Sequence, residues 1–269
     1  MQGTGWPELL RDYLKYCAYK IQYKQKGYLD LSREKFMYPT TLLPLLILVS
    51  EITPNKTIMP ENRDLANYIQ VARGQHLTDD TKTYIPLTKL PKQQRDASFV
   101  VEKIRRLAED TEIAVENLNE LIYIVEELIA NIYEHSEFKE AYMFAQRYKN
   151  RGVMDLCFVD DGITIPRSFE KIGIIYNRDL HAEAIYNALH GLSSKREPGR
   201  GTGLKSVGRL VREGFEGEIL IVSGFGAVYA AAKGEPLFIT LLEETEFKGT
   251  LASIRVPLKK AVKSLYDFL

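Results

Sequence analysis

The feature that most constrains the fold is a long helical pattern in the middle of the 269-residue chain. Apolar residues recur there at alternating spacings of four and three, which places them on one face of a helix. These residues are Ala114, Leu118, Leu121, Val125, Leu128 and Ile132. Glu127 and Asn131 are four residues apart and fall together on another face. Asparagine is a mediocre helix former, so its position here indicates either a solvated polar face or a functional role.

Three later segments favour the functional role. The first, Val159 to Pro166, follows an apolar strand and turns sharply at Asp160-Asp161-Gly162. The second, Gly199 to Leu204, reads GRGTGL and leads directly into a helical pattern. The third, Gly249-Thr250, opens the last strand of the chain. Each segment alone is a weak signal. Together with the helix that carries Glu127 and Asn131, however, the three segments form four motifs in a specific order along the chain.

This order resembles the motif boxes of the superfamily that contains gyrase, a heat-shock chaperone, histidine kinases and mismatch-repair ATPases (GHKL, the Bergerat ATP-binding fold). The resemblance covers about residues 95–260. It implies ATP and magnesium as ligands. The sequence itself predicts an α/β fold, a two-layer sandwich with a largely antiparallel sheet, because long helices are followed by a run of strands.

Within this resemblance, Asn131 corresponds to the magnesium ligand. Glu127 corresponds to the general base of the ATP-hydrolysing and serine-kinase branches, and Glu126 is the neighbouring candidate. Typical histidine kinases lack an acid at that place, which disfavours a phosphohistidine kinase. His135 fits the Asn-x-x-x-His pattern of the anti-sigma-factor kinases, or it complements the dipole at a helix C-terminus.

The second box implies recognition of adenine. Asp160 is expected to accept a hydrogen bond from the exocyclic amine, and Gly162 is expected to permit the backbone turn beside the base. Asp161 replaces the more frequent asparagine, and Thr164 stands where the family has a second glycine. Thr250 is expected to support the water network around the base. Without the other boxes, these residues would read as an ordinary acidic turn and a strand threonine.

The glycine-rich segment implies phosphate binding, since glycines let backbone amides approach the phosphates at a helix N-terminus. The nucleotide-binding residues predicted here are Lys195, Gly199, Arg200, Gly201, Thr202, Gly203 and Leu204. Lys205 is a further candidate charge partner. The polar segment 193–198 is expected to form a lid that orders when nucleotide binds.

Residues 1–90 are expected to form a small α/β domain, and residues 91–269 the ATP-binding domain. The predicted elements of the first domain are a helix over 7–23, strands at 28–32 and 57–60, and helices over 45–52 and 62–72. This unit resembles a STAS domain on Asp30-Leu31-Ser32 and Thr40-Thr41. The family's small-residue loop is replaced, so a phosphoacceptor role for Thr40 or Thr41 stays open. A generic dimerisation or packing lobe is the alternative.

Residues 74–97 read as a polar linker that contains one strand, 84–87. The C-terminal strands 218–222, 227–232, 236–242 and 249–256 are expected to form an antiparallel meander.

Composition limits the classes of function. The chain has 36 basic and 36 acidic residues and no net charge, so nucleic-acid binding gains no support. Cys17 and Cys157 are far apart, without metal-ligand spacing, and indicate reduced thiols in a cytoplasmic protein. The longest apolar run, 42–49, is too short to span a membrane.

The sequence leaves three kinds of function open. The first is a nucleotide-dependent regulatory switch that hydrolyses ATP slowly. The second is an anti-sigma-type serine/threonine kinase acting on a STAS-like partner. The third is a non-catalytic, ATP-gated interaction module. A protein partner or a homodimer is expected in each case, and Glu127 favours the first two.

Overall fold

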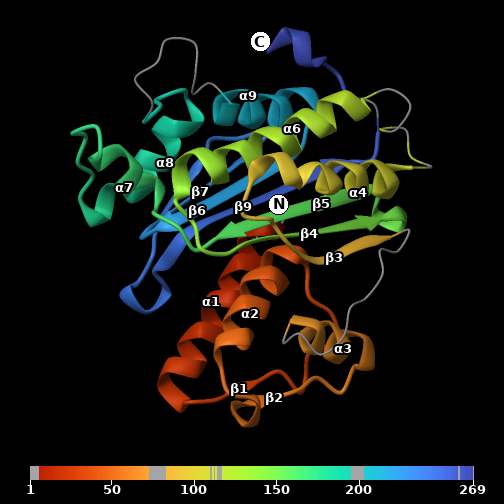
Figure 1. Ribbon diagram of the computed structural model, residues 1–269, viewed down its shortest axis with the longest axis vertical. Helices are drawn as coiled ribbons and strands as arrows, with labels where there is room; N and C mark the ends of the chain where they lie inside the picture. Colours follow the sequence, from red (N-terminus) through yellow and green to blue (C-terminus); the bar gives the residue numbers. More distant parts are fainter. Residues whose placement is uncertain are drawn as a thin grey trace, which may run out of the picture.

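Figure 1 shows a computed structural model of the chain, in which a wide sheet separates a layer of helices from the N-terminal segment. The structure describes residues 6–72, 83–109, 111, 113, 117–194, 203–259 and 261–268. Ala114, which belongs to the predicted helical stripe, lies outside this set.

Seven antiparallel strands form the sheet at the centre of the molecule. They are β3 (Tyr84–Lys89), β4 (Ala141–Tyr148), β5 (Val153–Asp160), β6 (Glu218–Gly224), β7 (Gly226–Ala231), β8 (Leu237–Thr240) and β9 (Phe247–Pro257). Their order across the sheet is β3-β4-β5-β9-β6-β7-β8. The longest strand, β9, therefore lies in the middle and pairs with both β5 and β6.

Helices cover one face of this sheet (Figure 1). They are α4 (Ser98–Ala108), α6 (Leu118–Asn131), α7 (Ile165–Glu170), α8 (His181–Leu189) and α9 (Gly203–Arg209). The apolar stripe of α6 is buried against the inward side chains of the sheet, in one continuous core. An α/β fold with a largely antiparallel sheet, as the sequence predicted, is thus confirmed.

The N-terminal segment packs on the opposite face of the sheet (Figure 1). Its elements are α1 (Glu8–Lys26), β1 (Leu29–Asp30), α2 (Pro39–Glu51), β2 (Thr57–Ile58) and α3 (Arg63–Ala72). The predicted strand pair is present but is only two residues long on each side, and it is parallel. Most of the segment is helical.

Helix α2 starts with a proline, and helix α3 starts with a capping asparagine. Helix α2 begins at Pro39, six residues before the predicted start, and contains Pro44 in its interior. Proline disfavours a helix interior because it lacks an N–H, but the burial of nine of the thirteen residues of α2 compensates. Asn62 caps α3, because its side-chain oxygen accepts a hydrogen bond from Leu65 N at 3.0 Å.

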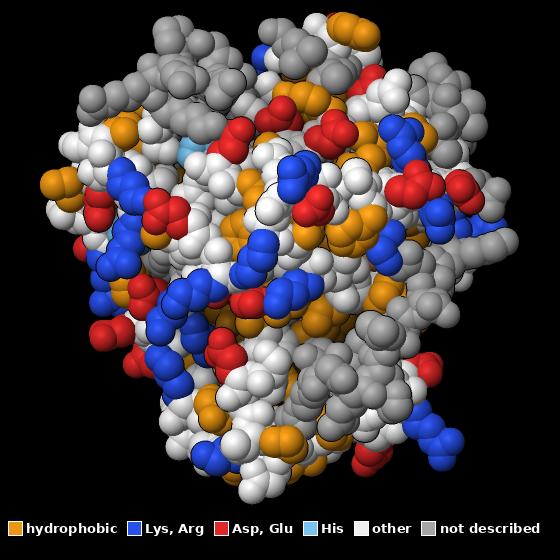
Figure 2. All heavy atoms as spheres, viewed as in Figure 1, with side chains coloured by type: hydrophobic (Ala, Val, Ile, Leu, Met, Phe, Trp, Pro, Cys, Tyr) orange, Lys and Arg blue, Asp and Glu red, His pale blue; other side chains and the backbone are white. Residues whose placement is uncertain are grey.

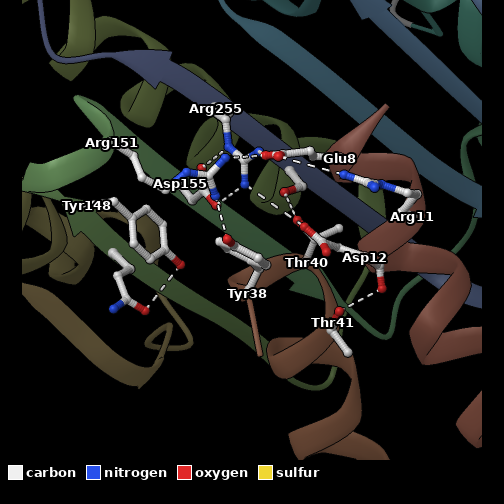
Figure 3. A network of polar contacts seen from close by, with 12 residues as sticks. Glu8, Arg11, Asp12, Tyr38, Thr40, Thr41, Tyr148, Arg151, Asp155 and Arg255 are labelled. Carbon is white, nitrogen blue, oxygen red and sulfur yellow. Dashed lines mark hydrogen bonds and ion pairs between the residues drawn. The ribbon is translucent and has the colours of Figure 1, made fainter. Parts of the chain in front are cut away.

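The segment shares a core with the sheet. Leu9 and Leu43 belong to the same buried cluster as Phe144 and Leu251. A polar network also crosses this contact (Figure 3). There, the Arg255 guanidinium donates to both carboxylate oxygens of Asp155, at 2.7 and 2.8 Å.

The same arginine reaches the N-terminal helices. Arg255 Nη1 lies 2.5 Å from Glu8 Oε2 on α1, and the guanidinium stacks 5.3 Å from the centre of the Tyr38 ring. Because apolar and ionic contacts both join the segment to the sheet, the two parts form a shared interior.

Three details of the architecture differ from the sequence-based expectation. The predicted linker strand is β3, an edge strand of the main sheet that begins at Tyr84 and pairs with β4. The predicted meander is correct only for β6-β7-β8, because β9 inserts between β5 and β6. Strand propensity is a local property, whereas the choice of neighbours depends on which faces each strand can bury.

The third difference concerns Thr40 and Thr41. Thr40 Oγ1 lies 2.6 Å from Ser253 Oγ, and Thr41 Oγ1 donates to Asp12 O at 2.7 Å. Both threonines are buried in the contact between α2 and its surroundings. A buried, hydrogen-bonded hydroxyl is inaccessible to a phosphoryl donor, which argues against a phosphoacceptor role for either residue in this conformation.

Charged side chains of both signs are interspersed on the surface seen in Figure 2. Within the part of the chain described here, no helix combines the length and apolar composition needed to cross a bilayer.

Candidate functional site

A cavity opens on the helix side of the sheet, between the end of α6, helices α7 and α8, and the strands β5, β6 and β9. It contains about 820 Å³ of empty space, including its open mouth. Five predicted binding residues line it: Asn131, Asp160, Thr164, Leu204 and Thr250. Chain segments more than 100 residues apart therefore meet at one site.

Apolar side chains form much of the wall of this cavity. They include Ile132, Phe158, Ile163, Phe169 and Ile221. The polar groups are few and converge from separate elements. A mainly apolar cavity with a few placed polar groups is typical of a site for a small organic ligand.

Asp160 ends β5 and is 3% exposed. Its Oδ1 accepts a hydrogen bond from Gly162 N at 2.9 Å. Burial raises the pKa of Asp160 to about 7, although the Gly162 N–H opposes this shift, and the neighbouring charge of Asp161 adds to it. The carboxyl group can therefore change its charge near neutral pH, and with it the hydrogen bonds that it can make.

Gly162 is needed for a reason that the sequence did not show. A Cβ on this residue would lie 2.0 Å from the carbonyl oxygen of Ser136. Next to it, Ile163 N donates to that same carbonyl at 2.6 Å. The glycine thus lets the turn after β5 pack directly on the end of the central helix, which closes this end of the cavity.

The two unusual residues of this box have structural roles. Asp161 Oδ1 accepts hydrogen bonds from Lys139 N and Glu140 N, each at 2.8 Å, and so holds the chain just before β4. Thr164 is the N-cap of α7, and its hydroxyl accepts from Arg167 N at 3.4 Å. The threonine in place of a second glycine therefore starts a helix beside the cavity.

Asn131 is the last residue of α6 and is half-buried at the cavity wall. Its Nδ2 donates to the carbonyl oxygen of Glu127, one turn earlier, at 2.8 Å. This bond fixes the orientation of the amide, since the nitrogen is held by the helix. The side-chain oxygen Oδ1 remains as the acceptor or ligand atom of the residue.

Glu127 lies on the same side of α6 but contacts the start of α9. A Cβ on Gly203, the first residue of α9, would lie 1.9 Å from Glu127 Oε2. Burial raises the pKa of Glu127, and the negative charges of Glu134 and Glu126 raise it further. Glu126 itself is exposed. A raised pKa makes the Glu127 carboxylate a stronger base than an exposed glutamate.

His135 lies one turn beyond Asn131, where α6 continues as a short π-helical turn over Ile132–Ser136. Its Nδ1 is 3.0 Å from Ser194 Oγ, and both residues line the cavity. The histidine therefore joins the end of the central helix to the segment that follows α8. This contact does not require a charged imidazole.

Part of the glycine-rich segment can be placed. Gly203 and Leu204 begin α9, and Leu204 reaches the cavity wall. Lys205 is exposed, with its aliphatic chain beside Gly191. The other predicted phosphate-binding residues lie outside the described residues: Lys195, Gly199, Arg200, Gly201 and Thr202.

Ser223 on β6 is a further polar residue of this region that the sequence did not reveal, and it is fully buried behind the cavity wall. It pairs with Thr250 in the sheet, and Thr250 pairs with Asp160 on its other side. The three polar residues form a row across neighbouring strands. The sequence shows a serine in an apolar strand, but it does not show that Thr250 is its neighbour, because this pairing depends on the insertion of β9.

Among the described residues, no group of three or more His, Cys, Asp or Glu side chains is placed to hold a metal ion. Neither a protein-family model, nor a curated protein, nor a solved structure matches this chain.

Proposed function

We propose that the protein binds ATP with magnesium in this cavity and acts as a nucleotide-dependent regulatory switch that hydrolyses ATP slowly. The observation that carries the proposal is the meeting of Asn131, Asp160 and Thr250 at one cavity, with Glu127 beside the first residue of α9. These residues are also the ones that the resemblance to the Bergerat ATPases selects.

The end of the cavity at Asp160 suits a purine base. Its walls are apolar, and the buried carboxylate offers an acceptor for an exocyclic amine. A base that lacks this amine cannot make the hydrogen bond to the carboxylate, which lowers its affinity relative to adenine. With a base in this position, the sugar and phosphates of the nucleotide would extend toward Asn131.

The other end of the site suits phosphates. Asn131 offers one side-chain oxygen, which is enough for magnesium because this ion takes several ligands from phosphates and water. When bound, the ion would neutralise phosphate charge. Gly203 has no side chain to separate the start of α9 from Glu127. The position of the Glu127 carboxylate beside Gly203 supports the proposal that it approaches a bound phosphate.

Glu127 is the residue that would perform chemistry. As a general base it would accept a proton from a water, or from a partner hydroxyl, that attacks the terminal phosphate. The two outcomes are hydrolysis and phosphoryl transfer. The burial of Thr40 and Thr41 disfavours transfer to this chain's own predicted acceptors, so a kinase would need an acceptor elsewhere.

Calorimetric titration with ATP, with and without magnesium, tests the proposal. We expect Asn131→Ala to remove most of the magnesium-dependent part of the affinity. Asn67→Ala, at an exposed position of α3, is the matched control and should leave the affinity unchanged. If wild type and Asn131→Ala bind equally with and without magnesium, the assignment of Asn131 is wrong. If wild type binds no ATP, the proposed function is wrong.

A further inference from the structure

The hydroxyl of Ser223 makes three hydrogen-bonding contacts behind the cavity wall. It donates to the carbonyl oxygen of Gly249 at 2.9 Å. It accepts from the backbone N–H of Ile165 at 2.9 Å. Its third contact is the hydroxyl of Thr250 at 3.0 Å. Ser223 itself is fully buried.

Counting protons gives the direction of the third contact. A serine hydroxyl has one proton to donate and two lone pairs to accept with. The carbonyl of Gly249 can only accept, so it takes the proton of Ser223. With that proton on Gly249 O, the contact between the two hydroxyls has Thr250 as the donor and Ser223 as the acceptor.

This direction changes what Thr250 offers to a ligand. Its only hydroxyl proton points back toward Ser223, and its two lone pairs remain for the cavity. Asp160, the next residue in the row, also presents acceptor oxygens when it is ionised. The base end of the cavity thus presents two acceptors side by side.

Building on the proposed nucleotide site, we propose that Ser223 is a positioning residue that holds Thr250 as an acceptor and thereby selects a purine with a 6-amino group. An amino group, directly or through a water that it orients, can donate to this row. A 6-keto purine presents an acceptor at the same position and meets only acceptors. Ser223 acts through Thr250 and does not itself line the cavity.

The test compares binding of ATP and ITP, which differ in the base at position 6 and adjacent N1. Wild type is expected to prefer ATP. In Ser223→Ala, the Thr250 hydroxyl is released and can turn its proton toward the ligand. The ATP-to-ITP affinity ratio is therefore expected to fall about tenfold, the effect of one hydrogen bond. Thermal unfolding of each variant is recorded alongside.

Ser253→Ala is the matched control. Ser253 is also a fully buried serine and is hydrogen-bonded to Thr40, but it belongs to the contact with the N-terminal segment. Its substitution is expected to lower stability and to leave the ATP-to-ITP ratio unchanged. If Ser223→Ala does not fold, Ser223→Cys carries the same test, because a thiol is a weak donor and acceptor.

A double-mutant comparison separates positioning from a general loosening of the site. Thr250→Val removes the hydroxyl that Ser223 orients, so Ser223→Ala should have no further effect on the ratio in that background. An equal effect in both backgrounds, or an unchanged ratio in Ser223→Ala, would overturn the inference while leaving nucleotide binding intact. Absence of ATP binding by wild type would instead overturn the proposed function, and this inference with it.

Discussion

The Glu127 carboxylate lies against the backbone of Gly203, so closely that a Cβ on the glycine would be 1.9 Å from Oε2. The two residues come from α6 and α9, and the contact joins the central helix to the start of the segment that we associate with phosphate binding. The position of the carboxylate therefore depends on a residue that has no side chain.

Gly203→Ala is expected to displace Glu127, because the flexible carboxylate gives way before the backbone does. ATP hydrolysis should fall while ATP binding is largely kept. In a Glu127→Ala background the clash is gone, so Gly203→Ala should have no further effect on turnover. Steady-state phosphate release and calorimetric binding measure both quantities. A similar loss of turnover in the two backgrounds would show that Gly203 acts independently of Glu127.

Glu127→Gln is expected to separate binding from chemistry. A general base acts in the transition state and contributes little to ground-state affinity. Turnover should fall by roughly 10²–10⁴-fold with ATP affinity nearly unchanged. Glu126→Gln, one residue earlier and exposed, is the matched control and should retain turnover.

Incubation with labelled ATP and a lysate, with free phosphate and labelled protein measured separately, distinguishes hydrolysis from phosphoryl transfer. If turnover is equal in wild type and Glu127→Gln, Glu127 is removed from the mechanism. If wild type shows neither activity but nucleotide changes its oligomeric state, a non-catalytic switch is favoured.

Asp160→Asn is expected to change base preference. The amide can still accept from Gly162 N through its oxygen, but its nitrogen presents a donor where the carboxylate presented an acceptor. ATP affinity should fall, and ITP or GTP should be favoured relative to wild type. Competition binding with the three nucleotides measures the change. An ATP preference equal to that of wild type would contradict the assignment of Asp160.

The pH dependence of stability provides an independent test of Asp160 without nucleotide. The folded-state pKa is raised to about 7 from an ordinary value of 3.8. Between these values the folded state binds more protons than the unfolded state, so this group's contribution to stability is lost as pH rises through 7. The amide of Asp160→Asn does not titrate, so the stability of this variant does not fall with pH through this group.

The variant should therefore gain stability relative to wild type between pH 4 and pH 8, by up to about 4 kcal/mol. Urea unfolding at several pH values gives the difference, with Asp179→Asn at an exposed site as control. The same pH slope in wild type and Asp160→Asn would show that the carboxyl group is not buried as described.

Asp155→Ala is expected to weaken the contact between the N-terminal segment and the sheet (Figure 3). The substitution leaves the buried Arg255 guanidinium without its bidentate partner. Removing one member of a buried ion pair costs about 3–5 kcal/mol. Urea denaturation measures the loss, and Lys259→Ala, in an exposed pair with Glu216, should leave the midpoint nearly unchanged. A midpoint shift equal to that of the control would show that the network contributes little.

Local patterns in the sequence determined most of the individual elements. The period of the apolar residues predicted α6, and an apolar strand was predicted directly before Asp160, where β5 ends. The four-residue spacing placed Glu127 and Asn131 on one side of the helix. These predictions depend only on neighbouring residues, because helix and strand periods decide which side chains share a face.

Only the tertiary structure decided which elements became neighbours. The insertion of β9 between β5 and β6 places Thr250 between Asp160 and Ser223, and the packing of α2 on the sheet buries Thr40. Each strand has an apolar face, but its sequence does not specify which strand it pairs with, so many pairings satisfy the same pattern. The partner is chosen by the burial of both faces of β9 at once, which is a property of the whole chain.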